Sequence, residues 1–169
     1  MPKTRHYALA SFFGPGREEM TSYTPYARHL GMKVIETGPG FAVMVLPYRP
    51  ELVGDPVRKL VFGGAITSLL DQASGLAVAC ALDALRAIAT VDLRVDYLRA
   101  AAPGSDLFAR VDCYRVTRNI AFARGIAYEH GPDDPFAVCL GTFKLGGGRS
   151  RNSIERLVRA CASGGKEAP

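Results

Sequence analysis

The chain has 169 residues, of which 48% are hydrophobic and 22% are charged, and its formal net charge is +5. This length is enough for one domain with a hydrophobic core, and the composition is that of a globular protein rather than a disordered or fibrous one. The lysines and arginines are scattered and are not interleaved with aromatic residues. We therefore expect no nucleic acid as the main partner.

The cysteines, the histidines and the longest apolar stretch argue against a metal site and a membrane-spanning helix. The three histidines are dispersed, and so are the four cysteines, Cys80, Cys113, Cys139 and Cys161. Because no CxxC pair occurs, we expect no metal site, and free thiols fit a cytoplasmic location. The most apolar stretch, 65–82, contains Asp71 and Gln72, so we expect no membrane-spanning helix.

The first part of the chain predicts an arm and a short helix. We expect residues 1–24 to form an N-terminal arm and the main domain to cover residues 25–146. Apolar residues at helical spacing over 17–30 predict a short or broken helix, because Pro25 interrupts the pattern. Gly31 is expected to end that helix.

A hairpin and a loop are expected next. Residues 32–36 and 41–47 have the composition of strands, and the Gly38-Pro39-Gly40 turn between them predicts a hairpin. The prolines in and beside 48–61 favour a loop over this segment.

A long helix is predicted from Gly63 to residue 85. Its apolar residues cover most of the circumference, which is typical of a helix at the centre of a domain. Asp71 lies in the middle of this helix, where a carboxylate is costly to bury unless it is paired or functional. Gly75 leaves room for a strand, a partner helix or a ligand to approach closely.

Four strands are predicted after the helix. Residues 89–97 alternate between apolar and polar side chains, so one face is expected to carry Ala89, Val91, Leu93, Val95 and Tyr97. Further strands are expected over 107–116, 120–128 and 136–145, and the small residues of 120–128 favour packing against a helix. Because consecutive strands are expected to form hairpins, we predict that these four strands are antiparallel.

One long helix against one antiparallel sheet is an α+β arrangement. The sheet covers only one side of a helix that is apolar nearly all round, so we expect a second copy of the chain on the other side. Three glycines at 146–148 indicate a linker. Residues 147–169 are therefore expected to form a Gly-rich linker followed by a short amphipathic helix and a tail.

Several short motifs follow one another in a distinctive order, at 26–32, 52–56, 62–64 with Asp71, 89–99 and 141–143. Together they resemble the hotdog-fold thioesterases, in particular the phenylacetate-type (PaaI-like) acyl-CoA thioesterases. The resemblance covers about residues 25–146 and implies a hotdog fold, in which an antiparallel sheet wraps around a long central helix. It also implies hydrolysis of an acyl-CoA by homodimers or homotetramers with interfacial sites, and no metal or cofactor beyond the CoA of the substrate.

Thioester hydrolysis requires a carboxylate that activates water or attacks directly, and donors that stabilise the oxyanion. We expect Asp71 to supply the carboxylate, and the N–H groups of Gly63 and Gly64 at the helix start to be the donors. Gly63 and Asp71 are eight residues apart, about 12 Å along a helix, so one carbonyl carbon cannot contact both groups of one chain. Two chains are therefore expected to share each site. The resemblance implies that Thr90 orients the nucleophile or the water.

The chain departs from the family at two positions. Relatives have a His before the glycine pair, where this chain has Phe62, which either packs or contacts substrate. Relatives often have Asn or Gln in the preceding loop, where Asp55 is the nearest match. Gln72 is a further candidate beside the site. Arg99 and Arg118 are candidates to bind the phosphates of CoA, although strand-face arginines are more commonly solvated.

Phe62 keeps a second hypothesis open, in which the chain is a non-catalytic hotdog protein that binds acyl-CoA or another apolar ligand. A hotdog hydratase or dehydratase is a third hypothesis, but no histidine is suitably placed for that chemistry.

Overall fold

The computed structural model describes residues 24–84 and 86–146. The predicted arm up to residue 23 and the predicted linker and helix over 147–169 lie outside these residues. The elements, in chain order, are α1 (Pro25–Leu30), β1 (Lys33–Gly38), β2 (Phe41–Leu46), the 3-10 turn η2 (Pro50–Leu52), β3 (Val53–Asp55), β4 (Leu60–Val61), α2 (Gly63–Cys80), β5 (Ile88–Tyr97), β6 (Leu107–Val116), β7 (Ile120–Tyr128) and β8 (Ala137–Leu145).

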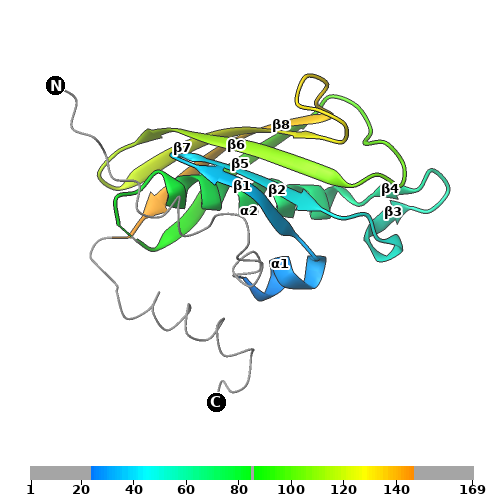
Figure 1. The fold of residues 1–169 in the computed structure, drawn as a ribbon, viewed down its shortest axis with the longest axis horizontal. Helices are drawn as coiled ribbons and strands as arrows, with labels where there is room; N and C mark the ends of the chain where they lie inside the picture. Colours follow the sequence, from blue (N-terminus) through cyan, green and yellow to red (C-terminus); the bar gives the residue numbers. More distant parts are fainter. Residues whose placement is uncertain (1–23, 85, 147–169) are drawn as a thin grey trace, which may run out of the picture.

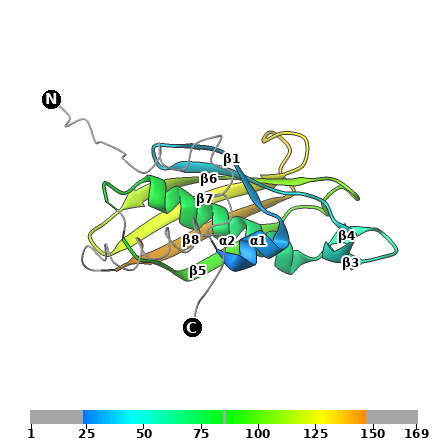
Figure 2. The same ribbon diagram turned by 60° about the horizontal axis from the view of Figure 1, so that its bottom comes forward.

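Six strands form one antiparallel sheet in the order β1-β2-β6-β7-β8-β5, and α2 lies across one face of it (Figures 1 and 2). The buried face of α2 includes Leu69, Leu70 and Ala73, which are fully shielded from solvent. The small-residue face of β7, with Ala121 and Ala123, is buried in the same core. The predicted α+β fold, a sheet around one long helix, is therefore confirmed.

The position of β5 differs from the prediction. This strand pairs with β8 at the edge of the sheet, whereas β6 pairs with β2 and β7. The segment 98–106 therefore crosses between distant strands and is not a hairpin turn. Local sequence predicted the antiparallel direction correctly, but the choice of neighbour depends on which strands can pack under α2.

A β-bulge in β5 makes the predicted alternation wrong. Thr90 pairs with Phe143 and Asp92 with Thr142, so Val91 is an extra residue without a partner in β8. Val91 is consequently 62% exposed, although the alternation predicted it on the face of Leu93. The bulge also turns Thr90 towards α2, on the same side as the partly buried Leu93.

Helix α1 is defined by its two ends. The Thr24 hydroxyl accepts a hydrogen bond from the N–H of Ala27, and Pro25 occupies the first turn, where its missing N–H costs nothing. Gly31 ends the helix with a φ of 74°, as predicted. Because the helix begins only at Pro25, α1 is shorter than the predicted segment. It lies beside α2 (Figure 2).

Helix α2 ends at Cys80, five residues before the predicted end. The N–H of Gly40, in the β1–β2 turn, donates to the carbonyl of Cys80 over 3.3 Å and so caps the helix from a distant part of the chain. The apolar residues after Cys80 carry no local stop signal, which is why their pattern continued the predicted helix. No described helix has the length and hydropathy that a membrane crossing requires.

The predicted loop over 48–61 contains ordered structure. β3 and β4 form a small hairpin that projects beyond one end of the main sheet (Figures 1 and 2). The Asp55 carboxylate accepts hydrogen bonds from the N–H groups of Val57 and Arg58, and Lys59 takes a φ of 56°. This turn chemistry closes a hairpin that is too short to show a strand pattern in the sequence.

Candidate active site

Asp71 lies in the middle of α2 on the side that faces β5, and its side chain is half-buried. The hydroxyl of Thr90 donates a hydrogen bond to Asp71 Oδ1 over 2.8 Å. Two of the predicted site residues, one from a helix and one from a strand, are therefore in direct contact. The bulge at Val91 is what places Thr90 on this side of the sheet.

The first turn of α2 has two N–H groups available for a ligand. Phe62 donates its N–H to Leu52, and the N–H groups of Ala65 and Ile66 reach the Phe62 carbonyl. Within the described part of the chain, the N–H groups of Gly63 and Gly64 have no partner. The positive end of the helix dipole adds to their ability to stabilise an anion.

The Phe62 side chain lies against the same turn. A Cβ added to Gly64 would meet the Phe62 ring at 2.4 Å, and one added to Gly54 would lie 3.1 Å from the ring. A side chain at Gly64 would therefore displace the ring, whereas one at Gly54 would require only a small shift. Phe62 is still 63% exposed, so an apolar surface borders the two free N–H groups.

Tyr97 and Ser68 also contact this turn, and neither contact was expected from the sequence. The Tyr97 hydroxyl donates to the carbonyl of Gly63 over 3.0 Å, and the Ser68 hydroxyl donates to the carbonyl of Gly64 over 2.8 Å. A serine inside a helix commonly donates to the carbonyl four residues before it, so this contact has a local signal. Tyr97 had no such signal, because its contact depends on where β5 lies.

The side chains of Gln72 and Asp55 contact residues other than Asp71. The Gln72 side chain accepts a hydrogen bond from the Thr24 hydroxyl, which joins α2 to the start of α1. Asp55 forms an ion pair with Arg58 inside the β3–β4 hairpin, over 2.7 Å. Hydrogen bonds from the backbone and then the side chain of Arg58 lower the pKa of Asp55. A role for either residue in binding substrate stays a prediction.

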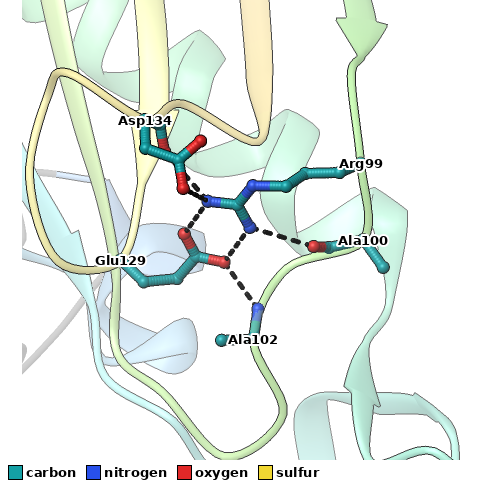
Figure 3. A network of polar contacts seen from close by, with 5 residues as sticks. All are labelled: Arg99, Ala100, Ala102, Glu129 and Asp134. Carbon is teal, nitrogen blue, oxygen red and sulfur yellow. Dashed lines mark hydrogen bonds and ion pairs between the residues drawn. The ribbon is translucent and has the colours of Figure 1, made fainter.

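Arg99 is held in a network of polar contacts (Figure 3). Its guanidinium makes two hydrogen bonds of 2.8 Å to Glu129, whose side chain is 1% exposed, and a third contact of 3.1 Å to Asp134. Glu129 also accepts a hydrogen bond from the N–H of Ala102. The hydrogen bond to Glu129 is the main reason that the pKa of Arg99 is raised. Arg99 therefore fixes the crossing segment after β5, and a contact with CoA phosphate stays a prediction.

Arg118 lies in the exposed turn between β6 and β7, which the hydrogen bond from Thr117 to Ile120 closes. Lys144 in β8 pairs with Ile120 on one side and with Ala89 on the other. The turn of Arg118 is thus at the same end of the sheet as Thr90, and opposite the end where Tyr97 meets Gly63. Arg118 remains a candidate for binding phosphate at the Asp71 end.

The described cysteines are unsuited to act as nucleophiles. Burial raises the pKa of Cys80 to about 12 and also raises that of Cys113 and Cys139. These thiols therefore stay protonated near neutral pH, and they are not joined in disulfides. The carboxylate of Asp71 is the better-placed reactive group.

A hollow of about 640 Å³ lies elsewhere, chiefly on the face of the sheet away from α2. Its walls include Arg110 and Arg124 beside the apolar Ile126 and Leu140. None of the predicted site residues lines it, so it is separate from the Asp71–Thr90 pair.

The arrangement supplies two halves of a hydrolytic site. Asp71 and Thr90 form a carboxylate held by a hydroxyl, and Gly63 and Gly64 form a pair of free N–H donors. Because α2 is one continuous helix, these halves are about 12 Å apart in a single chain. The two halves of one chain therefore cannot act on the same carbonyl group.

Comparisons with known proteins agree with this chemistry. Residues 59–133, which include the start of α2 and both Asp71 and Thr90, match the family model described as the thioesterase superfamily. The medium/long-chain acyl-CoA thioesterase YigI of Escherichia coli K12 is 33% identical over an alignment of 120 residues, and the match covers 63% of this chain and 77% of YigI.

Solved structures show the same fold. A crystal structure of a Pseudomonas aeruginosa protein has 36% sequence identity and a TM-score of 0.66, and the match covers 75% of this chain and 96% of that one. The PaaI protein of the E. coli phenylacetic acid degradation operon has a TM-score of 0.69 at 19% identity, with coverage of 84% and 94%. At that identity the likeness to PaaI concerns the fold.

Proposed function

Since the chain belongs to the thioesterase superfamily and is a thioester hydrolase, we propose that it hydrolyses an acyl-CoA to the free acid and CoA at a site shared between two subunits. The hydrogen bond between Thr90 and Asp71 supports this proposal most directly. It fixes one carboxylate oxygen and leaves the other for a water molecule or for direct attack. The acyl-CoA class comes from the name of YigI.

In the proposed reaction, Asp71 takes a proton from water, and the resulting hydroxide attacks the carbonyl carbon of the thioester. The carbonyl oxygen becomes an oxyanion, which the N–H groups of Gly63 and Gly64 stabilise. Collapse of this intermediate breaks the carbon–sulfur bond and releases CoA, whose thiolate is then protonated. Direct attack by Asp71 would instead form an anhydride that water hydrolyses.

A second copy of the chain is proposed to complete each site. β5 is an edge strand of the sheet, so its outer backbone groups can pair with another strand. Pairing of two β5 edges about a two-fold axis would place two α2 helices side by side and antiparallel. Gly63 and Gly64 of one chain would then approach Asp71 of the other.

The exposed side of α2 leaves space for such an approach. Gly64, Ser68, Asp71 and Gly75 follow one another at helical spacing and lie on one face. A Cβ added to Gly75 would have no atom within 4 Å, so a neighbouring helix has room there. A cytoplasmic homodimer or dimer of dimers, without a cofactor, is part of this proposal.

The test is hydrolysis by wild-type protein and by Asp71→Asn across acyl-CoAs of increasing chain length. Released CoA is measured by chromatography. We expect wild-type turnover, and a loss of about 10²-fold or more in kcat for Asp71→Asn. Activity that survives this substitution would remove Asp71 from the mechanism.

Phe62 supports a second candidate function, the binding of acyl-CoA without hydrolysis. Its exposed ring lies beside the free N–H groups, at the position where the family resemblance implies a His. Saturable binding of acyl-CoA by wild-type protein without release of CoA would favour this alternative.

A further inference from the structure

We propose that Tyr97 is a positioning residue for the reaction, because it fixes the peptide group between Gly63 and Gly64 and thereby aims the Gly64 N–H at the oxyanion. This inference rests on the proposed function, in which that N–H is a donor. It also gives the two glycines different roles, because Tyr97 orients the N–H of Gly64 and not that of Gly63.

Tyr97 is the last residue of β5, and its side chain contacts the start of α2. Its hydroxyl donates to the Gly63 carbonyl over 3.0 Å and lies 3.4 Å from the Thr67 hydroxyl. A Cβ added to Gly63 would be 3.2 Å from the Tyr97 oxygen, so the absence of a side chain at Gly63 allows this close approach. Tyr97 is 49% exposed and does not belong to the hydrophobic core.

The geometry of a peptide group connects this contact to the reaction. The carbonyl of Gly63 and the N–H of Gly64 belong to one planar trans peptide, so a bond that fixes the carbonyl also fixes the direction of the N–H. As the first residue of α2, Gly63 also accepts the helical bond from the N–H of Thr67. The Tyr97 bond is a second restraint on this peptide, whose two glycines tolerate a wide range of φ and ψ. A hydrogen bond at the carbonyl also polarises the peptide and strengthens its N–H as a donor.

Ser68 provides a matched comparison on the next peptide. Its hydroxyl donates to the Gly64 carbonyl over 2.8 Å, at least as short a bond as that of Tyr97. The N–H of that peptide belongs to Ala65 and is already bonded to the Phe62 carbonyl. Both hydroxyls therefore support the helix start, but only the Tyr97 bond lies on a peptide whose N–H is free.

The test compares wild-type protein, Tyr97→Phe and Ser68→Ala in single-turnover hydrolysis of an acyl-CoA that the wild type accepts. We expect Tyr97→Phe to lower the maximal rate about 3- to 10-fold, with the half-saturating concentration changed less than about twofold. Ser68→Ala is expected to lower the maximal rate less than Tyr97→Phe does, since it affects a peptide without a free N–H. Thermal unfolding of all three proteins is measured in parallel.

A maximal rate of Tyr97→Phe equal to that of wild type would overturn the inference. Equal losses in Tyr97→Phe and Ser68→Ala, together with lowered midpoints of thermal unfolding, would also overturn it, because the effect would then be on the fold of the turn. If Asp71→Asn is inactive while Tyr97→Phe has full activity, only this inference fails. If the wild type hydrolyses no acyl-CoA, the proposed function fails and this inference fails with it.

Discussion

The hydroxyl of Thr90 lies 2.8 Å from Asp71 Oδ1, although the two residues are 19 positions apart in the chain. The bond connects the middle of the central helix to the edge strand. Because a hydroxyl donor stabilises a carboxylate in one orientation, Thr90 restricts the orientation of Asp71, as the proposed reaction requires.

Replacement of Thr90 by Val and by Ser should distinguish the effect of its hydrogen bond on kcat from the effect of its side-chain shape. Thr90→Val removes the hydroxyl and should lower kcat about tenfold, because hydrogen bonds to charged groups contribute about 1.5–3 kcal/mol. Thr90→Ser keeps the hydroxyl and should retain most of the activity. Steady-state hydrolysis of acyl-CoA measures both, and equal losses in the two variants would contradict an orienting role.

Mixed dimers should reveal whether a site is shared. Asp71→Asn lacks the carboxylate, and Gly64→Pro lacks one donor in the first helical turn, where the backbone accepts Pro if the exposed Phe62 ring moves aside. If each site takes Asp71 from one chain and Gly64 from the other, a mixed dimer of the two inactive variants has one intact site of two and should show about half of wild-type activity.

The variants are co-expressed with different affinity tags, and the mixed dimer is purified before the assay. Each variant purified alone is the control and should be inactive. A mixed dimer without activity would place each site within one chain, and a monomer in size-exclusion chromatography would exclude the shared site altogether.

The Phe62 side chain is predicted to contribute to substrate binding. Since it is 63% exposed, Phe62→Ala should leave the midpoint of thermal unfolding nearly unchanged. The loss of apolar surface beside the N–H donors should raise KM about 3- to 10-fold. Val57→Ala is a suitable control, because Val57 is 90% exposed on the nearby hairpin. An unchanged KM in Phe62→Ala would show that the ring does not contact substrate.

The Arg99–Glu129 pair is predicted to stabilise the fold (Figure 3). Glu129→Gln replaces a buried carboxylate that accepts hydrogen bonds from Arg99 and Ala102, and should lower the free energy of unfolding by about 1–3 kcal/mol. Urea denaturation measures this change. Asp134→Asn is the control, since the Asp134 side chain is 86% exposed and its substitution should change the urea midpoint little.

The Arg99–Glu129 pair also makes the free energy of unfolding depend on pH. Burial alone would raise the pKa of Glu129, but hydrogen bonds from Arg99 and from the Ala102 N–H outweigh it, so the pKa is lowered in the folded state. As pH falls, Glu129 therefore takes up its proton in the unfolded chain at a higher pH than in the folded protein. The stabilisation is present above the ordinary glutamate pKa of about 4.3 and is lost as pH falls from there through the lower pKa of the folded state. The difference in free energy of unfolding between wild type and Glu129→Gln should therefore shrink below that pH. A constant difference down to strongly acidic pH would contradict this linkage.

The sequence by itself determined the elements that depend on local chemistry. Apolar periodicity predicted α2, alternation predicted β6 and β7 with their observed bounds, and Gly31 predicted the end of α1. The candidate residues Asp71, Gly63 and Gly64 were also identifiable, because a carboxylate inside an apolar helix and two glycines at its start are local features.

Only the tertiary structure decided the relationships between distant segments. No local pattern encodes the pairing of β5 with β8 or the bulge at Val91. The end of α2 at Cys80 likewise depends on a distant contact, the hydrogen bond from the N–H of Gly40. The contact of Tyr97 with Gly63 has the same origin, since it requires the last residue of β5 to lie at the start of α2. Local chemistry therefore provided the reactive groups, whereas long-range packing provided the hydroxyls that hold them.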